Sequence, residues 1–179
     1  MDAHVKYKDS AGHRGDNHFY QAPMSSLEKA ISQIRTNLAG DEKLYDIISD
    51  LNDYITDYPL RQIIGLDKKL EQGKRQDLIE EAILLKNKFE RRIAKNQMSM
   101  SEQHIYVQVL ATINTIWQLK IKPMISNGDS SQAVDEAILQ NLIQPVHTAI
   151  VTYDSLINTD TVRGMLFFLT GKCHLAWEK

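Results

Sequence analysis

The sequence predicts an all-α protein, folded as a single-domain helical bundle of six or seven helices with short loops. Apolar residues recur at every third or fourth position along most of the chain, which is the spacing of one face of an α-helix. Capping signals precede several of these periodic stretches, and no stretch keeps the apolar alternation that is typical of a β-strand. A chain of 179 residues is also the usual size of one domain.

The periodic stretches follow one another as seven helices. Ser25 and Glu28 form a capping box, in which each side chain accepts a hydrogen bond from the other residue's amide, and Ser99 begins a second such box. We expect Pro123 to end the fifth helix and Pro145 to kink or divide the sixth, because proline lacks a backbone N–H and clashes with the preceding turn. The expected helices cover residues 25–39, 41–58, 61–72, 76–96, 99–122, 132–156 and 159–170.

Residues 1–24 form a polar stretch ahead of the bundle, which is expected to occupy residues 25–179. Gly12, Gly15 and Pro23 interrupt this stretch, so we expect a partly flexible arm. Phe19 is the large apolar side chain of the arm that we expect to contact a partner.

Composition and charge exclude several classes of protein. The chain has 21 basic and 23 acidic side chains and a net charge of -2, so it lacks the strongly basic balance of many nucleic-acid-binding proteins. Its one cysteine cannot form an internal disulfide, which fits a reducing compartment. No apolar run has the length of a transmembrane helix, and the first residues do not resemble a signal peptide. We therefore expect a cytoplasmic protein without direct membrane contact.

The last twenty-one residues, 159–179, are unusually apolar and aromatic for a chain end. Thr159 is the expected N-cap of the last helix, and Gly171 can take the left-handed conformation that ends a helix. The chain's only cysteine, Cys173, follows within two residues, with His174 and Trp177 after it. So much apolar surface has to pack, either on the core of this chain or on a partner.

Two kinds of chemistry remain open at this end of the chain. Cys173 could act as a nucleophile if His104 or His147 came close enough to serve as its base. The same three residues with His174 also form a set of ligand types that bind zinc, although their spacing matches no helical metal motif. The commoner fates are a buried cysteine and a histidine hydrogen-bonded near the core. A zinc-binding helical enzyme or sensor is therefore an alternative function.

A nucleic-acid-binding subunit is a second alternative. Basic residues cluster at 68–75 and 88–95, but acidic residues are interleaved with them, so a continuous phosphate-binding track is not indicated. The chain also lacks the glycine-rich loop that P-loop ATPases use to bind phosphate.

The stretch VRGMLFFLTGKCHLAW, residues 162–177, resembles the closing signature of the C-terminal domains of bacterial ABC-three-component systems. Upstream, residues 78–82 leading to Lys86 and Phe89 look like the preceding helix of the same domain, so the resemblance covers about 65–179. On this resemblance, the structural residues of the motif are Arg163, Gly171, Cys173 and His174.

The resemblance implies a place in an anti-phage or anti-plasmid defence complex. Its partners would be an ABC ATPase of the SMC type and the effector or middle component of the same operon. The chain would be a non-enzymatic adaptor that works by protein–protein contact, without a cofactor, reaching nucleic acid only through the complex; self-association stays open. In such a role Gly164 would allow close helix approach, and Phe168 and Trp177 would serve as partner anchors beside Phe19.

Overall fold

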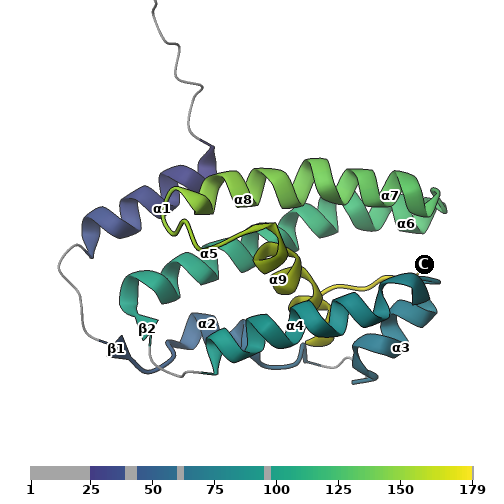
Figure 1. Ribbon diagram of the computed structural model, residues 1–179, viewed down its shortest axis with the longest axis horizontal. Helices are drawn as coiled ribbons and strands as arrows, with labels where there is room; N and C mark the ends of the chain where they lie inside the picture. The colour runs from purple at the N-terminus through teal and green to yellow at the C-terminus, as the bar shows by residue number, and fades with distance from the viewer. Residues whose placement is uncertain (1–24, 39–43, 60–62, 95–97, 179) are drawn as a thin grey trace, which may run out of the picture.

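A computed structural model of the chain describes residues 25–38, 44–59, 63–94 and 98–178 (Figure 1). Within these ranges it is an all-α bundle of seven continuous helical rods, which confirms the predicted fold class. Two of the rods consist of two α-helices joined without a break by a π-helical turn. The helices are α1 (Ser26–Asn37), α2 (Ser49–Ile55), α3 (Gly65–Gln72), α4 (Ile79–Ile93) after a 3-10 turn (Gln76–Leu78), α5 (Met100–Ile116) joined to α6 (Lys122–Asn127), α7 (Ser131–Ile138) joined to α8 (Gln144–Val151), and α9 (Thr159–Gly171).

The capping residues set where the helices begin. The side chain of Ser25 accepts a hydrogen bond from the Glu28 amide, and the side chain of Glu28 accepts one from the Ser25 amide, so the first capping box is confirmed. Ser99 caps α5 by accepting from the amide three residues on. The last helix begins after Asn158, whose side chain accepts from the Thr161 amide, so the N-cap lies one residue before the predicted Thr159.

The predicted helix over 41–58 is wrong over the described residues 44–48. Leu44–Tyr45 forms a short strand, β1, that pairs antiparallel with β2 (Met98–Ser99), and α2 begins only at Ser49. The cause is the fully buried side chain of Gln103, which accepts from the Ile48 amide at 2.7 Å and donates to the Asp46 carbonyl at 2.9 Å. These bonds hold the chain before α2 in an extended form.

Neither proline breaks its rod. The prediction that the helix halts at Pro123 is wrong, because the rod continues into α6 and ends at Gly128, which has a left-handed φ of 82°. A π-helical turn precedes each proline: Trp117–Ile121 before Pro123 and Leu139–Ile143 before Pro145. In a π turn each amide bonds to the carbonyl five residues before it, and not four as in an α-helix. This wider turn accommodates the proline that follows, which has no amide hydrogen to donate. Before Pro145, where a kink or two abutting helices were predicted, α7 passes through the π turn into α8 without a break.

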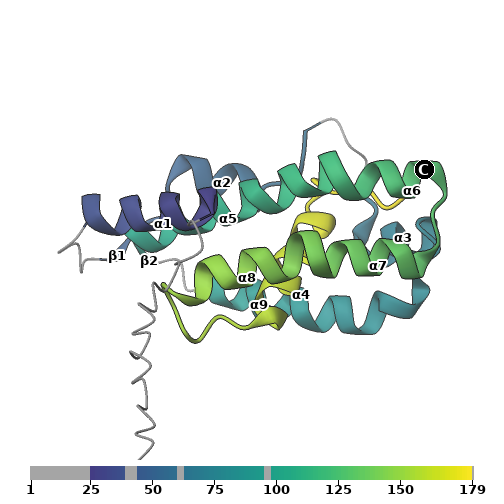
Figure 2. The same cartoon turned by 90° about the horizontal axis from the view of Figure 1, so that it is seen from above.

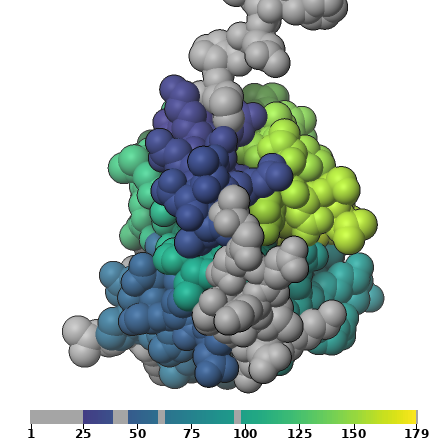
Figure 3. Space-filling view, turned by 90° about the vertical axis from the view of Figure 1, so that its left-hand side faces the viewer, coloured from purple at the N-terminus to yellow at the C-terminus, as the bar shows by residue number. Residues whose placement is uncertain are grey.

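Helix α9 lies in the middle of the bundle. In Figure 1 the α7–α8 rod runs above it and α4 below it, and Figure 2 shows the α5–α6 and α7–α8 rods lying side by side along the molecule. At one end α1 packs against α8 (Figure 3), where the Arg35 guanidinium lies 5.6 Å from the centre of the Tyr153 ring. Eight of the thirteen residues of α9 are buried, because helices of several rods cover it.

The most extensive helix contact among the described residues is between α9 and α4. At Gly164 a Cβ atom would lie 2.7 Å from the Leu85 carbonyl oxygen and 3.3 Å from Phe89 Cβ. A glycine is therefore required for α9 to lie this close to the α4 backbone, as the sequence predicted for a close helix approach. The helix that Gly164 approaches is α4 of this same chain.

Replacing Gly164 by alanine should destabilise the fold. We expect Gly164→Ala to lower the free energy of unfolding by about 2 to 3 kcal/mol, because a backbone carbonyl cannot move aside as a side chain can. Gly171→Ala is the matched control: its Cβ would meet only the flexible end of the Lys86 side chain. We expect that change to stay within about 0.5 kcal/mol of the wild type. Urea unfolding followed by tryptophan fluorescence measures both, and equal stability of the two variants would contradict this account.

Candidate functional site

Residues 172–178, called here the C-terminal segment, leave α9 and pack back over the bundle. The carbonyl oxygens of three alternate residues in this segment accept hydrogen bonds from elsewhere in the chain. The donors are Tyr58 N to Lys172 (2.9 Å), Gln118 Nε2 to His174 (3.3 Å) and Trp117 Nε1 to Ala176 (3.2 Å). Two of these donors belong to the α5–α6 rod at its π turn, so the irregular turn positions the groups that hold the C-terminal segment.

A buried lysine joins α3 to the end of α9. Lys69, only 6% exposed, donates from Nζ to the Thr170 carbonyl at 2.6 Å and lies 3.3 Å from the Gly171 carbonyl. The same Nζ lies 2.9 Å from Cys173 Sγ. The last carbonyls of a helix carry its partial negative charge, so an ammonium group is favoured there. Lys69 therefore holds the end of α9 and the start of the C-terminal segment together.

Cys173 makes the turn that the sequence assigned to Gly171. Gly171 is the last residue of α9, whereas Cys173 has the left-handed φ of 65°. The His174 amide then donates to the Leu169 carbonyl at 2.9 Å, which closes the end of the helix. A left-handed cysteine is strained, so the contacts of its neighbours have to hold it there.

His174 is buried under two tyrosines. Its Nε2 lies 3.3 Å from the Thr56 carbonyl oxygen, and the rings of Tyr54 and Tyr58 pack on it at centroid distances of 5.6 and 5.3 Å. The contact to Thr56 ties the C-terminal segment to the end of α2. This matches the commoner alternative of a histidine hydrogen-bonded near the core.

Trp177 anchors the far end of the C-terminal segment. Its indole N–H donates to Thr170 Oγ1 at 3.0 Å, and its ring packs on Trp117 with centroids 4.7 Å apart. At Gly73, where α3 ends, a Cβ would lie 2.6 Å from Trp177 Cβ, so no larger residue fits beneath the tryptophan. The Arg75 guanidinium lies 5.6 Å from the ring centre on another side.

Two arginines form ion pairs beside these contacts. Arg75 binds both oxygens of Asp135 and also pairs with Asp77, and the hydrogen bond from Arg75 lowers the pKa of the Asp77 carboxyl. Arg163 of α9 binds both carboxylate oxygens of Glu81 of α4, and that hydrogen bonding lowers the pKa of Glu81. All three are charge-assisted bidentate pairs, and they fix the orientation of the elements that they join.

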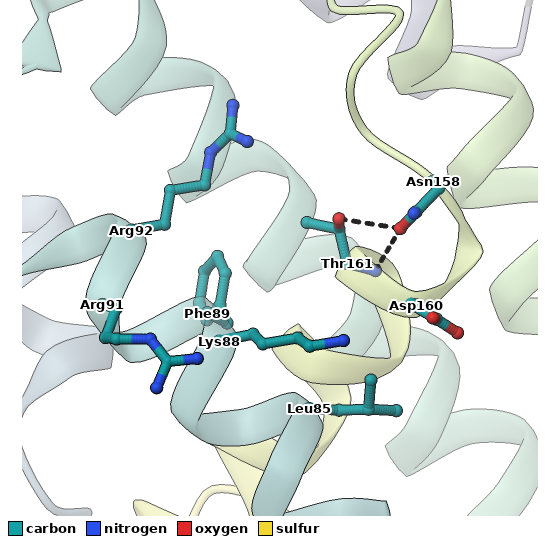
Figure 4. A pocket seen from close by; sticks show the side chains of 8 residues that line it. All are labelled: Leu85, Lys88, Phe89, Arg91, Arg92, Asn158, Asp160 and Thr161. Atoms are coloured by element: carbon teal, nitrogen blue, oxygen red, sulfur yellow. Dashed lines mark hydrogen bonds between the residues drawn. The ribbon is translucent and has the colours of Figure 1, made fainter.

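A pocket of about 370 Å³ lies between α4 and the first turn of α9 (Figure 4). In this view Lys88 extends from α4 toward Asp160, while Arg91 and Arg92 follow it one turn later on the same helix. We call this the α4–α9 basic pocket. Its lining residues are Leu85, Lys88, Phe89, Arg91, Arg92, Asn158, Asp160 and Thr161.

The family model for C-terminal domain 9 of the ABC-three component (ABC-3C) systems, CTD9, matches residues 65–177. The chain belongs to the CTD9 family. The match begins at the first residue of α3 and ends at Trp177, so it covers every contact of Lys69 with α9 and the C-terminal segment. No curated protein and no solved structure matches the chain.

The CTD9 fold places the predicted partner anchors inside this chain. Phe168 and Trp177 are each 2% exposed, and Gly164 is closed by the α4 backbone. Their surface is covered by the chain's own core, so the expectation that they present surface to a partner is corrected. Phe19, in the arm over residues 1–24, lies outside the described residues. The motif residues Arg163, Gly171, Cys173 and His174 all make contacts within the domain.

The structure does not assemble the proposed zinc ligands. Among the described residues, which include His104, His147, Cys173 and His174, no three histidine, cysteine or acidic side chains are grouped to hold a metal ion. The buried Sγ of Cys173 has the Lys69 ammonium beside it. In the same part of the chain, no helix has the length and apolar character needed to span a bilayer.

Sequence reasoning missed Lys69 and Arg75, which it counted only as members of a surface basic cluster. A signal for Lys69 was present: it lies between Leu66 and Leu70 on the apolar face of α3, at the i, i+3, i+4 spacing of buried residues. A charge at such a position needs a buried partner. No comparable sequence signal identifies Thr170 as the residue that accepts the hydrogen bond of the Trp177 indole, because the two residues are seven positions apart with a turn between them.

Replacing Lys69 should destabilise the domain more than replacing its neighbour. Lys69→Met keeps the length of the side chain but leaves the Thr170 carbonyl without its buried donor, so we expect a loss of about 3 kcal/mol of unfolding free energy. Lys68→Met, at an exposed position, should change stability by less than about 0.5 kcal/mol. Urea unfolding measures the difference. Equal unfolding curves for the two variants would show that Lys69 does not hold the C-terminal segment.

Proposed function

We propose that this CTD9 protein is a non-enzymatic adaptor of an ABC-3C assembly, acting by protein–protein contact in anti-phage or anti-plasmid defence. The observation that carries the proposal is the family match over residues 65–177, since the family is named as one domain of a multi-component system. Within such an assembly the domain would join the ABC ATPase to the effector or middle component.

The geometry of the motif supports an attachment role. The polar side chains that could have taken part in catalysis or metal binding make contacts within the chain. Lys69 contacts the end of α9, His174 contacts the Thr56 carbonyl, and Cys173 lies beside Lys69. Such contacts favour a rigid body with a fixed surface, and pre-organised surfaces lose less entropy when they bind. The buried cysteine and histidine favour this role over a nucleophilic or metal-dependent enzyme.

The proposal includes several properties of the adaptor. It works in the cytoplasm, needs no cofactor of its own and meets nucleic acid through the ATPase. The inward orientation of Lys69 and Arg75 supports the last point, because it removes two charges from the basic cluster over 68–75.

Co-purification tests this function. The tagged full chain, co-expressed with the ABC ATPase and the other component encoded beside it, should elute with at least one of them as a complex in size-exclusion chromatography. The chain alone should neither hydrolyse ATP nor cleave DNA. The control is the same chain co-expressed with the components of an ABC-3C system that has a different C-terminal domain, with which no complex should form. Failure to bind either cognate component, or nuclease activity of the chain alone, would overturn the proposal.

A further inference from the structure

We infer that the α4–α9 basic pocket is a docking site for an acidic, partly apolar segment of a protein partner. This inference rests on the proposed function and names the surface through which the adaptor makes one of its contacts. Four observations carry it: uncompensated cations, the orientation of α9, an apolar floor and an exposed leucine on the same helix face.

Two of the three cations that line the pocket, Lys88 and Arg91, have no ion-pair partner among the described residues. Both side chains are exposed. Other cations along α4 are paired: Lys86 with Glu90 at 2.7 Å and Arg92 with Asp154 at 2.6 Å. Because the whole chain carries a net charge of -2, two free cations on adjacent turns are a local departure that favours an acidic partner.

The first turn of α9 adds to the positive field. Helix N-termini carry partial positive charge on their free amides, and the start of α9 forms one wall of the pocket. The Asn158 side chain caps one of these amides, at Thr161. Asp160 opposes an incoming anion, but Arg163 Nη1 lies 3.8 Å from its carboxylate and reduces its effect. Charge on the walls of the pocket therefore remains positive overall.

An apolar component favours a protein segment over a nucleic-acid backbone. Leu85 and Phe89 form the floor of the pocket. Leu84, Lys88 and Arg91 follow at i, i+4 and i+7, so they share one face of α4, and Leu84 is 53% exposed. A segment with one apolar side chain followed by acidic residues complements this face. A phosphate backbone offers no apolar group to contact Leu84.

Charge reversal tests the docking site. The binding constant of the full chain for the purified cognate ABC ATPase, and for the other cognate component, is measured by isothermal titration calorimetry for three proteins. These are the wild type, Lys88→Glu with Arg91→Glu, and a control with the same charge change at exposed lysines elsewhere, Lys29→Glu with Lys120→Glu. We expect the pocket variant to lose at least about tenfold in affinity and the control less than about twofold. Leu84→Ser should weaken binding as well. Circular dichroism checks that each variant is folded.

The outcomes separate the inference from the proposed function. If the wild type binds and both charge variants bind equally well, the docking site is wrong and the adaptor function stands. If the wild type binds neither component, the proposed function fails and the docking site with it. The wild type and the two charge variants are also titrated with a short DNA duplex at low salt. If the pocket variant loses affinity for DNA while its affinity for both protein components is unchanged, the pocket is a nucleic-acid site and the inference is overturned.

Discussion

The Lys69 ammonium is the contact on which the end of this fold depends. It sits where the last carbonyls of α9 gather negative partial charge, and it reaches Cys173 as well, so one buried cation fixes both the helix end and the turn after it. The position of that turn sets the direction of the C-terminal segment. Only with this direction does the indole of Trp177 reach Thr170 and cover Gly73. The contacts of Trp177 with Thr170 and Gly73 thus depend on the position of Lys69, more than one hundred residues earlier in the chain.

The second constraint is the short distance between α4 and α9. Gly164 permits it, and the Arg163–Glu81 ion pair orients the two helices beside it. The α4–α9 basic pocket lies beside this contact, between α4 and the first turn of α9. The same pair of helices thus supplies a rigid interior and the surface that we assign to a partner.

Local signals made much of the helical pattern predictable. The capping box at Ser25, the cap at Ser99 and the apolar stripe of α4 each depend only on residues a few positions apart. The structure contains all three. Features that depend on distant residues were not predictable in this way. The strand at Leu44–Tyr45 depends on Gln103, and the continuation through Pro123 depends on a π turn that no local rule required.

The predicted partner anchors show the same limit. An aromatic tail has to be covered, but the sequence alone does not say by what. Trp177 is covered by Trp117, which lies in another rod, and Phe168 packs on Phe89 of α4. The surface cations Lys88 and Arg91 were visible in the sequence as a basic cluster, yet only the arrangement of α4 and α9 shows that they border one pocket.

The central place of α9 also governs how this protein can be made. Helix α9, the last helix described here, fills the middle of the bundle, and residues 172–177 then pack over the bundle. The earlier helices therefore emerge with an open interior and cannot close it until synthesis has passed Trp177. Until then the nascent chain exposes apolar surface, so chaperones have a long interval in which to bind it.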